Sequence, residues 1–348
     1  MSDALGEIGN PSSVHSFGRA ARRVVEDARR QVAAPAAVPP GNIVFTSGGT
    51  EANNLALRGC GRQRILVSAV EHPSVLEAAD EIETVPVDGD GIVDLEALAR
   101  LLQAGDAPAI VSVMLANNET GAIQPVAEAA ALAHERGALF HCDAVQAAGR
   151  LPLDFTALGV DMMTLSAHKM GGPKGAGALV VADPVHLQAL IRGGGQERGR
   201  RSGTENLPGI AGFGAAAELA AKGMEEAGGL AGLRDRLEDG ILHEVPTARI
   251  VGAGAERLPN TSCIALPGIS AETQVMALDL AGFAVSAGSA CSSGKVRASH
   301  VLRAMGLADE IAACAIRVSL GEGNDEADID AFLAAYADFA ERVGSPEA

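Results

Sequence analysis

The 348-residue sequence contains no tryptophan and a single tyrosine, and aromatic residues make up only 3% of it. Proteins that bind single-stranded nucleic acid stack the bases on aromatic side chains, and this chain has few of them. Basic residues are also scarce, since 27 Lys and Arg are outnumbered by 44 Asp and Glu, for a formal net charge of −17. Binding a phosphate backbone needs clustered cations. The composition therefore argues against nucleic acid as a partner.

Long apolar runs are missing as well. No stretch approaches the ~20 apolar residues that cross a bilayer. The first ten residues, MSDALGEIGN, do not show the basic start and apolar core of a secretory signal. We therefore expect a cytoplasmic protein with no membrane partner.

The cysteines do not form the pattern of a disulfide framework. Their number is odd, they are scattered, and no CxxC pair occurs. They are Cys60, Cys142, Cys263, Cys291 and Cys314. We expect no metal site and interpret each cysteine as a small buried hydrophobe unless a motif indicates otherwise.

Between Asn42 and Val181, short β-branched runs alternate with helical patterns. The predicted strands are NIVFTS, RILVSA, AIVSVML, ALFHCD, DMMTLSA and GALVVAD. The predicted helices include TEANNLALRG, PSVLEAAD, DLEALARLLQAG and VAEAAALAHERG, the last of them closed by Gly137. This alternation predicts a mainly parallel sheet between two helical layers. Ligands of such sheets bind beyond the carboxyl ends of the strands.

After Asn206 the pattern changes to long Ala-rich helical stretches with fewer strands. The strands expected there are ARIVG, TSCIAL and AIRVSLG, and the chain closes with the amphipathic helix EADIDAFLAAYADFAERV. This pattern predicts a smaller α+β domain after Asn206.

Three motifs stand at the ends of predicted strands. In FTSGGTEANN, the glycines after Ser47 and the following helix start would suit a phosphate, although an ordinary glycine-rich turn capped by Thr50 explains them equally well. The motif matches neither the P-loop nor GxGxxG, which disfavours a nucleoside triphosphate or a dinucleotide.

In HCDAVQAAG, the strand ends at Asp143 and Gln146 follows. Such a carboxylate either caps a helix or keeps a pyridinium nitrogen protonated. In TLSAHKMGGPKG, a strand delivers Ser166, His168 and Lys169 into a glycine-rich turn. A lysine that closes an apolar strand is unusual, and desolvation makes its amine a nucleophile. The three motifs together predict pyridoxal phosphate, bound to Lys169 as a Schiff base.

With these motifs in place, the chain resembles the cysteine desulfurases of the class V aminotransferase group, of the nitrogen-fixation and housekeeping type. The resemblance runs from about Gly9 to the C-terminus, through GNPSSVHSFGR, FTSGGTEANN, EHPSVL, NNETGAIQP, HCDAVQAAG, LSAHKMGGPKG, GGGQERGRRSGTEN and SAGSACSSG. It implies an α/β fold of pyridoxal-phosphate transferase fold type I, with a mainly parallel seven-stranded sheet. It also implies a large cofactor-binding domain over residues 13–215 and a small α+β domain formed by residues 1–12 and 216–348.

The resemblance assigns roles to individual residues. It implies that Lys169 holds the cofactor, that Asp143 pairs with its pyridinium nitrogen and that His72 stacks on its ring. The ring substituents would lie near Asn118 and Gln146, and the substrate near Asn10 and Arg317. The phosphate would be held by Gly49, Thr50, Ser166 and His168, and in the partner subunit of a homodimer by Thr204.

The family's sulfur-accepting cysteine corresponds to Cys291, in a segment of small residues that could swing. The expected activity is removal of sulfur from L-cysteine, giving L-alanine and a persulfide on Cys291. Lys169 or His72 would move protons, and an iron–sulfur scaffold or another sulfur acceptor, for cluster assembly or thiolation, would be the partner protein.

Family members usually begin with a strand and an Ala/Thr-rich segment, which is absent before GNPSS. Two alternatives to an active cysteine desulfurase stay open. One is a selenocysteine lyase or another class V pyridoxal-phosphate enzyme. The other is a shortened, inactive relative that serves as an assembly partner.

Overall fold

The structure is a computed structural model that describes residues 1–226, 229–288 and 298–344. The chain divides into two compact units. The first comprises residues 1–85, 94–115 and 124–225, and the second comprises residues 86–93, 116–123 and the chain from 226 onward. Residues 1–12 and 216–225 thus lie in the first unit, whereas the sequence-based division assigned them to the smaller domain. The assignment of a cofactor-binding domain remains a proposal.

A seven-stranded sheet forms the centre of the first unit, in the order β1-β7-β6-β5-β4-β2-β3. Its strands are β1 (Ile43–Thr46), β2 (Arg64–Ser68), β3 (Glu83–Val85), β4 (Ala109–Ser112), β5 (Leu139–Asp143), β6 (Met162–Ser166) and β7 (Gly177–Val181). Only β7 runs against its neighbours β1 and β6, and all other pairs are parallel. The mainly parallel α/β sheet is therefore confirmed. All six predicted strands are present, and β3 is an addition.

Helices cover both faces of this sheet, as two neighbouring residues of β1 demonstrate. Val44 packs in a cluster with residues of α3 (Gly49–Gly59). The next residue, Phe45, lies edge-on to Phe213 of α7 (Leu207–Glu226), with ring centroids 6.3 Å apart. Because successive strand residues point to opposite faces, α3 and α7 lie in different layers.

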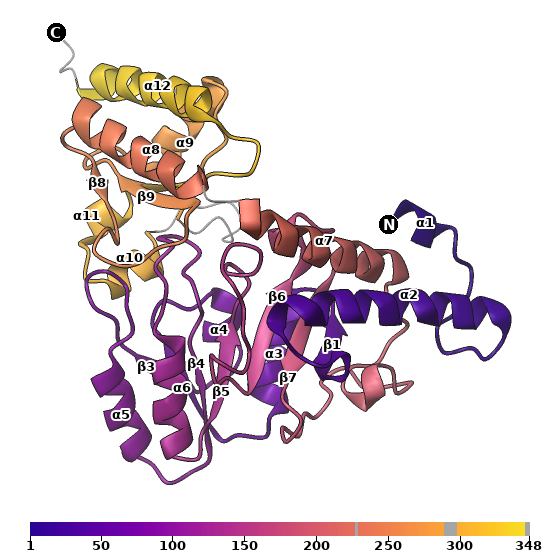
Figure 1. The fold of residues 1–348 in the computed structure, drawn as a ribbon. Coiled ribbons are helices and arrows are strands. Elements are labelled where there is room, and N and C mark those ends of the chain that lie inside the picture. Colours follow the sequence, from indigo (N-terminus) through magenta and orange to yellow (C-terminus); the bar gives the residue numbers. More distant parts are fainter. Residues whose placement is uncertain (227–228, 289–297, 345–348) are drawn as a thin grey trace. The chain divides into compact units, whose positions relative to one another are not determined.

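Helix α2 (Ser16–Ala33) lies beside α7 in the second of these layers (Figure 1). A Cβ at Gly214 of α7 would come within 2.7 Å of the Cα of Ala28. The two helices therefore approach closely where α7 has no side chain.

The other predicted helices of this unit are α4 (Pro73–Leu76), α5 (Leu95–Gln103) and α6 (Val126–Glu135). Gly137, expected to close α6, has a left-handed φ of +67°. Helix α4 is shorter than PSVLEAAD suggested, because it ends at Leu76. The remaining short helices are α1 (Ser2–Leu5), η1 (Ala34–Ala36), η2 (Pro40–Asn42), η3 (Ala167–Met170) and η4 (Glu197–Gly199).

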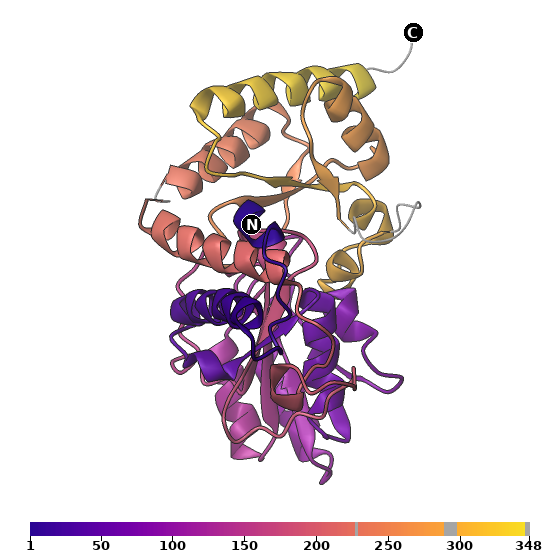
Figure 2. The same cartoon turned by 90° about the vertical axis from the view of Figure 1, so that its right-hand side faces the viewer.

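The second unit contains an antiparallel sheet in the order β10-β11-β9-β8. Its strands are β8 (Arg249–Ile250), β9 (Thr261–Ala265), β10 (Ser286–Ala287) and β11 (Ala315–Ser319), and its helices are α8 (Leu230–Glu244), α9 (Ala271–Leu280), α10 (His300–Ala304), α11 (Asp309–Ala312) and α12 (Glu326–Gly344). The closing helix α12, yellow in Figure 2, packs on α8 and α9. Its buried Tyr336 donates a 3.0 Å hydrogen bond to Gln274 of α9. The predicted α+β character is therefore present.

Within the part of the chain that the structure describes, no helix combines the length and the apolar character that crossing a membrane requires.

Candidate active site

Asp143 is the last residue of β5 and is buried, with 5% of the residue exposed. It accepts hydrogen bonds from the Asn53 amide at 2.7 Å and from the Val145 backbone N–H at 3.0 Å. Burial raises the pKa of Asp143, although these two hydrogen bonds and the charges of His72 and Lys169 oppose the rise. A cationic group bound against this carboxylate would relieve the cost of its burial.

A chain of hydrogen bonds connects Asp143 with His72. The Asn53 amide also donates to the Ser74 hydroxyl at 2.9 Å. The Nδ1 atom of His72 lies 2.8 Å from that hydroxyl and accepts the Ser74 backbone N–H at 3.1 Å. Since Nδ1 is an acceptor, a neutral His72 carries its proton on Nε2. The strand-end carboxylate and the predicted ring-stacking histidine therefore belong to one polar network.

Lys169 lies in η3, directly after β6, the strand that pairs with β5. Its charge acts on Asp143 and on His168. The guanidinium of Arg150 donates to the carbonyl oxygens of both Lys169, at 3.2 Å, and Gln146, at 2.6 Å. The two predicted cofactor residues are thus joined through Arg150, which our sequence interpretation did not include.

The turn formed by residues 47–49 after β1, called the glycine-rich turn from here on, packs against these strand ends. A Cβ on Gly49 would come within 3.1 Å of Val145 and 3.7 Å of Ser166. Ser166 in turn lies 2.9 Å from Nδ1 of His168. Burial, and then the charges of Lys169 and Lys174, lower the pKa of His168. Three of the four predicted phosphate residues, Gly49, Ser166 and His168, thus lie close together, and Thr50 follows Gly49 directly.

Helix α3 begins at this turn, and Glu51 in its first turn has two partners. It accepts the Ser47 backbone N–H at 2.8 Å and pairs with Arg201 at 2.8 Å. Although burial alone raises it, the hydrogen bonds from Arg201 and Ser47 hold the pKa of Glu51 below its ordinary value. A cavity of about 170 Å³ near this ion pair is lined by residues that include Ser47, Arg201 and the exposed Thr204.

Two predicted residues of the second unit are in contact. Arg317 lies on β11, and its guanidinium donates to the Asn118 carbonyl at 2.8 Å and to the Ser319 hydroxyl at 3.2 Å. The neighbouring Glu119 is buried and accepts a 2.6 Å hydrogen bond from Ser299. Arg317 is therefore held in place and can present its remaining donors to a carboxylate, the anion whose geometry a guanidinium matches.

Two further residues predicted for the site are Asn10 and Cys291. Asn10 lies in the first unit, where its side chain accepts the Ser12 backbone N–H at 2.9 Å. Cys291 lies outside the described residues. The other four cysteines are buried, as expected for small hydrophobes. Burial raises the pKa of Cys263 to about 12, so its thiolate is not available near neutral pH.

Asn53, Ser74 and Arg150 are site residues that sequence reasoning missed. Asn53 is 1% exposed on the inner side of α3, among apolar neighbours. A polar residue at an apolar helix position was the available signal, because buried amides need partners. Nothing in the sequence indicates that this partner lies 90 residues away on β5.

Comparison with known proteins connects this arrangement to one family. The family model described as aminotransferase class-V matches residues 4–332. A curated cysteine desulfurase of Cereibacter sphaeroides is 49% identical over 341 residues, which cover 94% of this chain and 87% of that protein. Two solved structures are also similar. The NifS-like protein of Rickettsia africae has a TM-score of 0.91 at 37% identity, with coverage of 98% and 94%. SspA in complex with cysteine has a TM-score of 0.77 at 28% identity, with coverage of 92% and 95%.

Proposed function

This chain belongs to the aminotransferase class-V family and is a cysteine desulfurase, and from this premise we propose that it takes sulfur from L-cysteine with pyridoxal phosphate held at Lys169 and Asp143. One observation carries the proposal. The ends of the adjacent strands β5 and β6 provide a buried carboxylate and an amine whose charge acts on it, and the glycine-rich turn packs beside them.

The residues at these strand ends fit the cofactor. Burial raises the pKa of Asp143, which means that the charged carboxylate is disfavoured. A positively charged pyridinium nitrogen beside it would stabilise the charged form. The Ser166 and His168 pair beside Gly49 offers hydrogen-bond donors to a phosphate. When bound, pyridoxal phosphate draws electrons from the substrate's α-carbon.

The protein's own side chains have separate tasks in this proposal. Lys169 would attach the cofactor, and its amine would move protons at the substrate carbon. The Nε2–H of His72 is placed to exchange a proton because Ser74 occupies Nδ1. Arg317 binds the substrate carboxylate.

Sulfur transfer is assigned to Cys291. Its thiolate attacks the substrate sulfur, so that an S–S bond forms and the substrate C–S bond breaks. The bonding electrons stay with the three-carbon fragment, which takes up a proton and leaves as L-alanine. The sulfur remains on Cys291 as a persulfide.

The experiment that tests this function supplies the purified protein with L-cysteine and a reductant, and measures alanine and sulfide. Equal amounts of both products are expected. Lys169→Ala should lower turnover by about 10³-fold or more, because it removes both the attachment point and a proton carrier. A folded protein that carries the cofactor but forms neither product would contradict the proposal and favour the inactive relative.

The comparisons favour a cysteine desulfurase over a selenocysteine lyase or another class V activity. Four finer features remain predictions from the sequence. They are the homodimer, the cytoplasmic location, the sulfur-acceptor protein, and the delivery of sulfur to iron–sulfur cluster assembly or thiolation. Incubation of the persulfide form with a candidate scaffold protein, followed by mass spectrometry of both proteins, tests the delivery directly.

A further inference from the structure

The segment from Gln196 to Asn206 contains two residues with unusual backbone conformations. Glu197 has a φ of +48° and Arg198 a φ of +58°, both in the left-handed region that side chains other than glycine rarely adopt. Such conformations persist only where the surrounding contacts hold them, and they concentrate at functional sites. Contacts on both sides therefore hold this segment, which carries Thr204.

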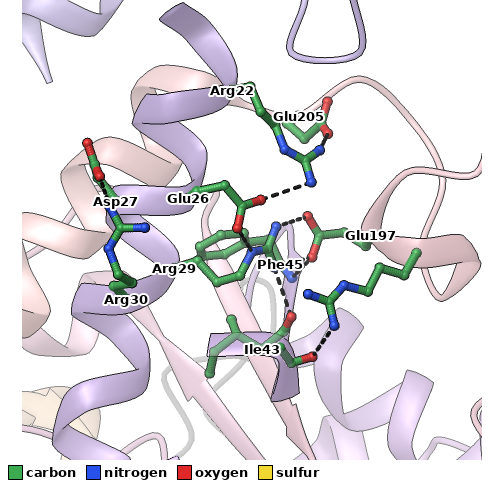
Figure 3. A network of polar contacts seen from close by, with 11 residues as sticks. Arg22, Glu26, Asp27, Arg29, Arg30, Ile43, Phe45, Glu197 and Glu205 are labelled. Atoms are coloured by element: carbon green, nitrogen blue, oxygen red, sulfur yellow. Dashed lines mark hydrogen bonds and ion pairs between the residues drawn. The ribbon is translucent and has the colours of Figure 1, made fainter. Parts of the chain in front are cut away.

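Glu197 has three close donors. Its carboxylate receives the two ends of the Arg29 guanidinium at 2.7 and 2.8 Å (Figure 3) and the Phe45 backbone N–H at 3.0 Å. Both side chains of the ion pair are less than a tenth exposed. One carboxylate thus ties the segment to α2 and to β1, the strand that leads into the glycine-rich turn.

Arg29 is fixed from several sides as well. Besides Glu197, it donates to the Ile43 carbonyl at 2.8 Å, lies 3.3 Å from Glu26 and stacks over the Phe45 ring at 4.8 Å (Figure 3). This guanidinium therefore has little freedom to move, and neither does the carboxylate it holds.

A second connection lies four residues further along the segment. Arg201 pairs with Glu51, which also accepts the Ser47 backbone N–H. The segment is thus attached on both sides of the glycine-rich turn, through Phe45 before it and Glu51 after it. Thr204 follows within three residues of the second attachment.

We propose that Arg29 and Glu197 are positioning residues that fix this segment so that Thr204 reaches the cofactor phosphate in the partner subunit. The inference rests on the proposed function, because both the cofactor and the role of Thr204 belong to it. The rival explanation is a buried ion pair with a purely structural role.

Three single variants separate the two explanations. Glu197→Gln removes the charge and one acceptor, and Arg29→Lys keeps the charge but loses the two-pronged contact. Glu238→Gln is the matched control, because Glu238 forms a similarly buried, bidentate pair with Arg257 at 2.6 and 2.7 Å in the second unit. The measurements are the melting temperature and the dissociation constant for pyridoxal phosphate, followed by the absorbance of the bound cofactor.

A positioning role predicts that Glu197→Gln and Arg29→Lys raise that dissociation constant roughly tenfold, the effect of one weakened charge-assisted hydrogen bond. Glu238→Gln should lower the melting temperature without changing cofactor affinity. Equal cofactor affinity in all three variants and the wild type would overturn the proposal. If Glu197→Gln does not fold, Arg29→Lys provides the same comparison.

Mixed dimers show in which subunit the pair acts. One mixed dimer combines a wild-type subunit with a subunit carrying both Glu197→Gln and Lys169→Ala. Only its wild-type subunit can bind the cofactor to a lysine. The cofactor affinity of that wild-type site should be reduced, because the Thr204 that reaches it comes from the subunit with Glu197→Gln. In a dimer of one Glu197→Gln subunit and one Lys169→Ala subunit, the single lysine site should keep wild-type affinity. The reverse pattern, or a wild-type protein that sediments as a monomer, would overturn the proposal.

The same samples distinguish failure of this inference from failure of the proposed function. Wild-type protein that forms alanine and sulfide while the variants bind cofactor normally contradicts the positioning role alone. Wild-type protein that binds no pyridoxal phosphate contradicts the proposed function.

Discussion

The side-chain amide of Asn53 donates a 2.7 Å hydrogen bond to Asp143 and a second one, at 2.9 Å, to Ser74. Both protons of one amide are therefore used to connect the strand-end carboxylate with the residue that orients His72. Asn53 stands on α3, the helix that starts at the glycine-rich turn. A single buried residue thus joins the parts of the site that are expected to hold the two ends of the cofactor.

We predict that Asn53→Ala weakens cofactor binding and lowers kcat/KM by roughly tenfold. The reason is that a buried acceptor such as the Asp143 carboxylate, left without its hydrogen-bond donor, costs about 1–3 kcal/mol. Asn53→Asp should be worse, since it places a second acid beside Asp143. Cofactor titration and steady-state assays measure both effects. The exposed Asn324→Ala is the control. Wild-type affinity in Asn53→Asp would show that Asp143 does not depend on this hydrogen bond.

Arg317→Lys should raise KM for L-cysteine. A lysine keeps the charge but cannot present two parallel donors to a carboxylate, and the expected loss is about 2 kcal/mol, close to thirtyfold. The kcat value should change less, because the substrate carboxylate does not react. The exposed Arg249→Lys on β8 is the control. An unchanged KM would remove Arg317 from the substrate site.

Much of the fold could be predicted from the sequence because its strands are short apolar runs with clear breaks between them. β3 was missed for a physical reason. It has three residues, only Val85 among them is buried, and it lies at the edge of the sheet, so it shows no apolar run. Helix α4 was overestimated because the apolar pattern continues through Ala78 and Ala79, whereas the i→i−4 hydrogen bonds end with the one from the Glu77 backbone N–H to the Pro73 carbonyl.

The candidate site likewise contains some residues that could be predicted from the sequence and others that could not. Lys169, Asp143 and the glycine-rich turn could be found because each stands at the end of a strand, and the carboxyl ends of parallel strands meet at one edge of the sheet. The residues that hold them could not be found, because their partners are distant in sequence. Glu197 and Arg29 are 168 residues apart, and neither residue type indicates the other.

The choice of the sulfur-accepting cysteine can be tested against a buried one. Cys291→Ser should abolish persulfide and sulfide formation while the cofactor still binds. Cys263→Ala should keep close to wild-type turnover, because burial raises the pKa of Cys263 to about 12 and leaves almost no thiolate. Sulfide release and mass spectrometry of the protein distinguish the two. Persulfide found on Cys263 would contradict the assignment.

His141 should make the protein less stable in mild acid. It is fully buried on β5, between the hydroxyls of Ser112 and Thr164, each 2.9 Å from a ring nitrogen. Burial lowers its pKa from 6.5 to about 3. Below pH 6.5 the unfolded chain therefore binds a proton at His141 that the folded protein does not bind. The contribution of neutral His141 to the unfolding free energy is complete above pH 6.5 and falls as the pH drops towards 3.

The contribution of His141 amounts to about 1.4 kcal/mol of unfolding free energy for each pH unit below its ordinary pKa. Urea denaturation of the wild type and of His141→Gln, near pH 7 and near pH 5, isolates this contribution, because glutamine forms hydrogen bonds but does not titrate. The variant should lose less stability than the wild type between the two pH values. His243→Gln, at an exposed histidine of α8, should behave as the wild type does. Equal losses in wild type and His141→Gln would mean that the buried imidazole accepts a proton without unfolding.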